Sequence, residues 1–159
     1  MRVKEIMSPS VTVGADDTLQ DVFRMFSERS ISGAPVVDER ENLIGVISES
    51  DMVKAVARHQ RRLRLVYPSL SFMSVTFEED SEGRDLVEVV REIQRTPVSS
   101  VMGREVITLS PEDGVKVALE RMTKGDVNRL PVVEDGKVVG IVARGDIIGY
   151  LSGHLDEES

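Results

Sequence analysis

Residues 45–51 read GVISESD, and residues 140–146 read GIVARGD. Each stretch carries a β-branched run into a polar segment that is typical of a helix start. Upstream of each lies a second matching block, ISGAPVV at 31–37 and VNRLPVV at 127–133. The same two blocks in the same order, found twice, indicate an internal duplication.

The correspondence extends to the beginning of each copy. VKEIM at 3–7 matches VSSVM at 98–102, and Thr12 matches Thr108. The copies are offset by about 95 residues, and two copies are too few for a solenoid. We therefore expect two similar units related by a pseudo-two-fold axis, each covering a face that the other cannot bury alone.

Each copy predicts the element order β-α-β-β-α. A short extended run, Val11–Val13 or Val106–Leu109, leads into an amphipathic helix. Asp16 with Asp17, and the stretch 110–113 (SPED), are the predicted helix starts. The apolar faces of these helices follow the i, i+3, i+4, i+7 spacing and comprise Leu19, Val22, Phe23 and Phe26 in the first copy and Val115, Ala118, Leu119 and Met122 in the second.

Two apolar runs around a polar turn follow in each copy and predict a β-hairpin. The runs are Ala34–Val37 and Leu43–Ile47 in the first copy, and Leu130–Val133 and Val138–Val142 in the second. A further helix is predicted from about Asp51 and from about Asp146.

The segment between the copies predicts one helix, Arg84–Arg95, which Thr96 and Pro97 should end. Its apolar face is Leu86, Val89, Val90 and Ile93. Tyr67–Asp80 is compatible with an apolar loop or with a short strand that packs on a partner. The expected boundaries are 1–58 for the first repeat, 59–97 for the insert and its helix, 98–153 for the second repeat and 154–159 for an acidic tail that frays.

Composition limits the function classes. The 159 residues are 40% hydrophobic and 30% charged, as in soluble globular proteins. The net charge of −8 disfavours general nucleic-acid binding. There is no cysteine, which excludes disulfides and cysteine-ligated zinc. With no signal-peptide core at the start and no apolar run of about 18–20 residues, we expect a soluble, cytoplasmic protein.

The segment GVISESD offers a candidate ligand site. Ser48 and Ser50 place hydroxyls where a helix begins, and a helix N-terminus suits a phosphate. A carboxylate there would repel phosphate, so Asp51 suits a donor such as a ribose diol. The alternative is purely structural: Ser50 caps the helix, and Asp51 only complements the helix dipole.

These duplicated motifs resemble the CBS-domain family in its tandem arrangement, the Bateman module. The resemblance implies an α/β (α+β) fold of two short sheets packed against each other with helices outside. It also implies clefts between the repeats that hold AMP, ADP, ATP or S-adenosylmethionine as a regulator, with no catalytic cofactor.

The family's ribose-and-phosphate motif is glycine, apolar, any, Thr/Ser, any, Thr/Ser, Asp. GVISESD matches it, which implies a ribose role for Asp51 and a phosphate or ribose role for Ser48 and Ser50. GIVARGD departs from it, because Ala143 and Gly145 carry no hydroxyl. In that copy Asp146 can still hold ribose, and Arg144 can supply charge.

The resemblance also implies a base pocket built from the strand that enters each hairpin: Ile31, Ser32, Gly33 and Ala34, and Val127, Asn128, Arg129 and Leu130. Arg129 would clamp a phosphate, or it forms a surface ion pair. Thr12 and Thr108 line the pocket, or they are ordinary strand residues.

The implied function is a stand-alone ligand sensor, not an enzyme, that acts on an unidentified regulated protein. The resemblance also implies a homodimer stacked through apolar helix faces. The alternative is an interaction or scaffold protein with decayed clefts.

A basic cluster of Arg58, Arg61, Arg62 and Arg64 is a solvated helix face, a contact to a second subunit or a nucleic-acid patch. His59 and His154 lack the spacing of a metal site.

Overall fold

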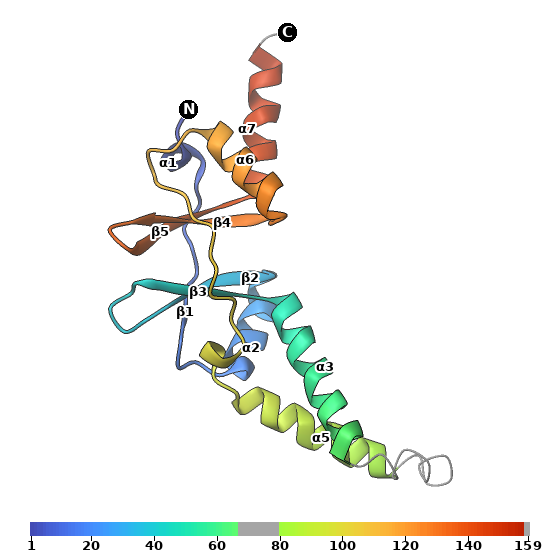
Figure 1. The fold of residues 1–159 in the computed structure, drawn as a ribbon. Coiled ribbons are helices and arrows are strands. Elements are labelled where there is room, and N and C mark those ends of the chain that lie inside the picture. The colour runs from blue at the N-terminus through green and yellow to red at the C-terminus, as the bar shows by residue number, and fades with distance from the viewer. Residues whose placement is uncertain (67–79, 158–159) are drawn as a thin grey trace. The chain divides into compact units, whose positions relative to one another are not determined.

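The computed structural model of the protein describes residues 1–66 and 80–157, with side chains for 1–58 and 87–154 (Figure 1). The segment 67–79 and the side chains of His59, Arg61, Arg62 and Arg64 lie outside this description. The chain forms two compact units, and each draws on both sequence copies. Unit 1 contains residues 1–13, 34–46 and 104–159, and unit 2 contains residues 14–33 and 47–103.

Unit 1 is built around the second hairpin. Strands β4 (Arg129–Glu134) and β5 (Lys137–Ala143) pair antiparallel, as predicted. Asp135 and Gly136 connect them with positive φ angles of 53° and 80°, the backbone that a two-residue hairpin turn requires. Helices α1 (Val3–Ile6), α6 (Val115–Gly125) and α7 (Arg144–Glu157) cover this hairpin, and the shared core is Val3, Leu109, Ala118, Met122, Leu130, Val132, Val142 and Ile147.

The first hairpin is also confirmed. It comprises β2 (Gly33–Val37) and β3 (Leu43–Ser48), and β1 (Val13–Gly14) completes a sheet in the order β1-β2-β3. The turns of the two hairpins meet within unit 1, where Leu43 N donates to Gly136 O at 3.0 Å. Residue Asn42 pairs with Lys137 beside this bond.

Unit 2 is helical. It contains α2 (Leu19–Arg29), α3 (Glu49–Val66), α5 (Asp80–Arg95) and the 3₁₀ turn η1 (Val98–Ser100). Helix α5 packs against both α2 and α3. It ends before Pro97, as predicted, and Leu19 N donates to Thr96 O at 2.9 Å. The buried side chains here include Leu19, Val22, Phe26, Met52, Val89, Ile93 and Val98.

The predicted starts of the two amphipathic helices are wrong. Helix α2 begins after Thr18, whose hydroxyl accepts a hydrogen bond from Asp21 N, and α6 begins only at Val115. The aspartates of these predicted starts accept hydrogen bonds from earlier amides instead, Asp17 from Gly14 N at 2.9 Å and Asp113 from Ser110 N at 2.8 Å. Each acid therefore closes a turn that precedes the helix.

Other boundaries also differ from the predictions. The extended run Val11–Val13 is reduced to the two-residue β1, and Val106–Leu109 contributes only a single bridge between Leu109 and Val132. Residues 154–157 of the predicted tail belong to α7. Helices α3 and α7 start two residues before Asp51 and Asp146. Among the predicted apolar-face residues, Val90 is 41% exposed.

The N-terminal segment is fixed to unit 1. Ser8 forms two backbone bonds with Ile141 on β5, each of 2.9 Å. Lys4 Nζ lies 2.8 Å from a Glu112 carboxylate oxygen, and Arg2 pairs with the other oxygen. The hydrogen bonds from Lys4 and then Arg2 hold the pKa of Glu112 below its usual value. The first residues of the chain thus complete the fold around the second hairpin.

Gly140 on β5 lies close to the N-terminal segment, so a side chain at this position is expected to lower stability. A Cβ there would lie 2.7 Å from Met7 Sδ and 3.1 Å from the Ser8 carbonyl oxygen. We predict that Gly140→Ala lowers the free energy of unfolding by about 1–3 kcal/mol, because the N-terminal segment must shift. Urea denaturation measures this change.

Gly149→Ala is the matched control, because nothing lies within 4 Å of its added Cβ on α7. Alanine favours the helix there, so stability should stay equal or rise by up to about 1 kcal/mol. Equal unfolding midpoints for Gly140→Ala and the wild type would contradict the predicted clash.

Candidate functional site

The end of β3 and the first turn of α3 form what we call the first half-site: Ser32, Ser48 and Asp51. Asp51 Oδ2 accepts bonds from Ser48 N and from Ser48 Oγ, both at 2.9 Å. Ser48 Oγ in turn accepts from Asp51 N at 3.3 Å. This reciprocal arrangement is a capping box, so Ser48 rather than Ser50 caps the helix, and the alternative assignment of Ser50 is wrong.

The first half-site keeps acceptor capacity. An ionised carboxylate has about four acceptor positions. The bonds from Ser48 both end on Oδ2 of Asp51, whose side chain is half-buried. Glu49 N donates to Ser32 O at 3.0 Å, which ties the helix start to the strand that enters the hairpin. Ser50 is exposed in the first turn of α3.

Unit 1 repeats this geometry at the second motif, in the second half-site: Asn128, Arg144 and Asp146. Ala143 N donates to Asp146 Oδ2 at 2.7 Å, as Ser48 N does to Asp51. Arg144 N donates to Asn128 O at 2.9 Å, as Glu49 N does to Ser32. The two motifs therefore fold alike at the backbone although their hydroxyls differ.

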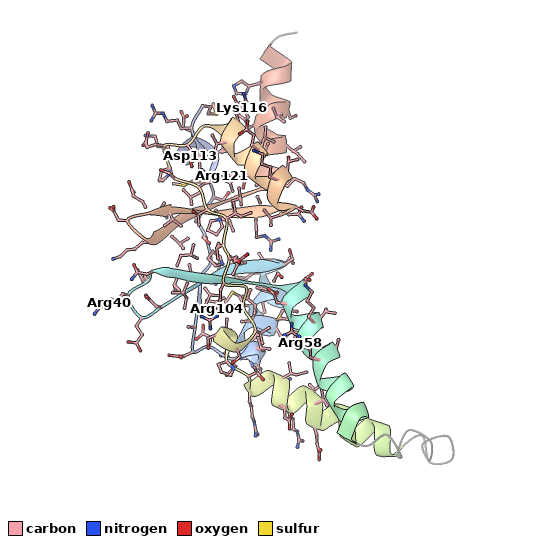
Figure 2. The ribbon with its side chains drawn as sticks, viewed as in Figure 1. Arg40, Arg58, Arg104, Asp113, Lys116 and Arg121 are labelled. Carbon is pink, nitrogen blue, oxygen red and sulfur yellow. The ribbon has the colours of Figure 1, made fainter. Side chains whose placement is uncertain are left out.

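The remaining predicted site residues are distributed as follows. Thr12 is exposed ahead of β1, and Ile31 is half-buried before β2, where Gly33 and Ala34 are buried. In unit 1, Val127 precedes β4, Arg129 begins it half-buried, and Leu130 is 1% exposed in the core. The carbonyl of Thr108 accepts a bond from Arg121, whose guanidinium also lies 3.2 Å from Asp113 Oδ2 (Figure 2).

Within each half-site the structure brings predicted site residues together. Ser48 contacts Asp51, and Asn128 contacts Arg144 through the backbone. The predicted ligand contacts of all the site residues stay predictions.

Sequence reasoning missed Ser8. Its hydroxyl donates to Asp146 Oδ1 at 3.2 Å, from a position 138 residues away in the chain. The duplication does contain a signal for Ser8. Ser8 directly follows the VKEIM block, whereas Gly103 directly follows the matching VSSVM block. The first copy therefore has a hydroxyl at this position and the second copy has none, which distinguishes the two copies.

The described residues contain neither a membrane-spanning helix nor a metal-binding cluster. No helix in ranges 1–66 and 80–157 is long and apolar enough to span a bilayer. Within residues 1–58 and 87–154, whose side chains are described, no three His, Asp or Glu side chains gather as metal ligands would. His154 instead places its Nδ1 3.0 Å from the Tyr150 carbonyl oxygen.

Comparison with known proteins agrees with the duplicated architecture. The uncharacterized protein MJ1426 of Methanocaldococcus jannaschii is 39% identical over 95% of this chain and 91% of its own length. Longer relatives also match: the chain spans 38% of MJ1232 from the same organism and 15% of an A-adding tRNA nucleotidyltransferase of Aquifex aeolicus. The matched region thus also occurs within larger proteins.

Solved structures share the fold. The CBS domain of a CBS domain containing membrane protein from Sphaerobacter thermophilus is 31% identical, with a TM-score of 0.69 over 94% of this chain and 86% of its own. CBSX2 in complex with AMP has a TM-score of 0.69 at 20% identity, covering 96% of each chain. The CBS pair of MJ0100, in complex with 5-methylthioadenosine and S-adenosyl-L-methionine, has a TM-score of 0.66 at 22% identity, covering 97% of this chain and 98% of that one.

The family model of the CBS domain matches the chain twice, at residues 3–58 and 98–153. These ranges are the two copies that the duplication defines, and each contains one motif whose aspartate the backbone holds in the same way. The chain therefore belongs to the CBS domain family, as a tandem pair of CBS domains.

Proposed function

We propose that this CBS pair is a regulatory module that binds an adenine nucleotide or another adenosyl ligand and signals to a partner protein. The observation that carries the proposal is the geometry of GVISESD. Asp51 is held by the amide and hydroxyl of Ser48 through Oδ2, at a helix start that favours anions. A ribose diol suits the carboxylate, and a phosphate suits the serine hydroxyls at the helix start.

The ligand class is supported by structures of the same fold. CBSX2 was solved with AMP, and the MJ0100 CBS pair with two adenosyl compounds. In this chain, Asp51 is the proposed ribose acceptor, and Ser48 and Ser50 are proposed to contact ribose or phosphate. Arg129 is proposed as a further phosphate contact from the second copy.

Calorimetric titration of nucleotide-stripped protein with AMP, ATP and S-adenosylmethionine tests the proposal. We expect saturable binding of at least one of the three, together with a ligand-dependent rise in melting temperature. Absence of both heat and thermal stabilisation with all three would refute the sensor. The alternative, a scaffold protein with decayed clefts, would then be the better explanation. The loss of both hydroxyls in GIVARGD favours this alternative.

We also propose that the protein self-associates through two exposed helix faces. The first helix face lies in unit 2, where α2 and α3 form a groove of about 340 Å³ lined by Phe23, Phe26, Ser27, Glu49, Met52 and Val53. Phe23 is 38% exposed and Val53 68%. Exposed apolar side chains grouped in a groove mark an interaction surface.

The second helix face lies in unit 1 on α6 and α7, which share the core around Met122 and Ile147. Its exposed apolar residues are Leu119 at 39%, Ile148 at 58% and Leu151 at 44%. Leu119 and Ile148 correspond to Phe23 and Val53 in the duplication. Each copy of the sequence therefore presents an equivalent apolar face.

The two helix faces differ in charge, which favours one way of pairing. Glu49 lines the first helix face, and Arg144 holds the equivalent position in the second. Lys116 follows the same stripe of α6 as Leu119, at i and i+3 (Figure 2). We therefore propose that the first helix face of one copy contacts the second helix face of another. Two such contacts can close a two-fold dimer.

A further inference from the structure

The second half-site lacks both motif hydroxyls, yet its aspartate still has a hydroxyl partner. Asp146 Oδ1 accepts from Ser8 Oγ at 3.2 Å, and Asp146 Oδ2 accepts from Ala143 N at 2.7 Å. Asp51 likewise has one amide and one hydroxyl donor, but both belong to Ser48. The same pair of donor types thus holds both aspartates, and in unit 1 the hydroxyl comes from the N-terminal segment.

Ser8 is fixed in place by its backbone. It exchanges two 2.9 Å bonds with Ile141, which lies two residues before Ala143 on β5. Gly140 permits this approach, because any Cβ there would meet Met7 and the Ser8 carbonyl oxygen. Ser8 and Asp146 are both half-buried. The bond therefore joins a held segment to the first turn of α7.

The hydrogen bonds to Asp146 are spread over both of its carboxylate oxygens, and this arrangement suits a diol. Each carboxylate oxygen can accept about two hydrogen bonds. Since Asp146 has one protein donor on each oxygen, each oxygen keeps one acceptor position. Two adjacent hydroxyls, such as those of a ribose, can then each bond to a separate oxygen.

We infer that Ser8 is the positioning residue of the second half-site: its hydroxyl takes the place of the one that Ala143 lacks and holds Asp146 in position for the ribose diol of the proposed ligand. The inference deepens the proposed function and rests on it. It predicts that the second half-site binds the adenosine part of a ligand despite its incomplete motif.

The test weakens the first half-site with Asp51→Asn, so that binding at the second half-site dominates the titration. AMP, ATP and S-adenosylmethionine are titrated into Asp51→Asn and into Asp51→Asn/Ser8→Ala. We expect Ser8→Ala to weaken binding by about threefold to tenfold, less than the loss of a direct hydrogen bond between a charged group and the ligand, because Ser8 acts through Asp146. Ser8→Thr, which keeps the hydroxyl, should restore the affinity. Ser10→Ala is the matched control, because Ser10 Oγ donates to the Val11 carbonyl oxygen instead.

A second readout separates positioning from a merely structural role. If Ser8 acts through Asp146 on the ribose, its removal should not change the affinity for 2′,3′-dideoxy-AMP or 2′,3′-dideoxy-ATP. An equal loss for the ribose and dideoxy forms would overturn the inference, as would unchanged affinity in Ser8→Ala. Failure of Asp51→Asn to bind any of the three ligands, while wild type binds, would also overturn it. Failure of wild type to bind would refute the proposed function itself.

Discussion

Asp51→Asn is expected to reduce adenosyl-ligand affinity at the first half-site by about tenfold to a hundredfold. Asparagine keeps the shape of the side chain and one acceptor oxygen for the Ser48 amide, so the capping box at 2.9 Å is retained. It removes the negative charge and the second acceptor oxygen that we assign to the ribose. A hydrogen bond to a charged group contributes about 1.5–3 kcal/mol, which gives this range. Calorimetric titration with the ligand that wild type binds measures the change.

Asp21→Asn is a matched control for this variant. Asp21 forms the same box at the start of α2, where its Oδ2 accepts from Thr18 N at 3.1 Å and from Thr18 Oγ1 at 3.0 Å. Both substitutions should therefore change the melting temperature by a similar, small amount. Only Asp51→Asn should weaken ligand binding. Equal affinity losses in the two variants would show that capping, and not ribose contact, explains the role of Asp51.

The hairpins and the interiors of the helices were predictable because they depend on local apolar periodicity. Alternating or repeated Val, Ile and Leu positions place β2 to β5 correctly, and the i, i+3, i+4 spacing locates α2, α5 and α6. The helix starts were not predictable from acid positions alone. Asp17 and Asp113 each accept a hydrogen bond from an amide three residues earlier in the chain, which closes a turn before the helix.

The candidate site was predictable where its contacts are local. Ser48 and Asp51 are three residues apart, so the motif itself places them together. Ser8 and Asp146 are separated by 138 residues, and their contact depends on how the N-terminal segment pairs with β5. A motif search within GIVARGD records only lost hydroxyls. In the folded chain, the hydroxyl of Ser8 donates to Asp146 instead.

The charge difference between the helix faces leads to the second large effect, on self-association. Under the proposed pairing of unlike faces, Glu49 of one copy lies near the cationic Arg144 face of the other. Glu49→Arg would place like charges across both contacts, and so would Arg144→Glu. We expect each single variant to weaken self-association at least about tenfold, because opposed like charges in an interface are costly. Sedimentation equilibrium over a range of concentrations measures this.

The double variant Glu49→Arg/Arg144→Glu restores opposite charges at both contacts and should associate like wild type. An equimolar mixture of the two single variants should also recover, because each then meets a complementary face. Pairing of like faces gives a different pattern: Glu49 would already oppose its own copy, so a single reversal would exchange one repulsion for another and leave association unchanged. Unchanged single variants, or a wild type that stays monomeric at every concentration, would therefore refute the unlike-face contact. Recovery in both the double variant and the mixture would establish which face meets which.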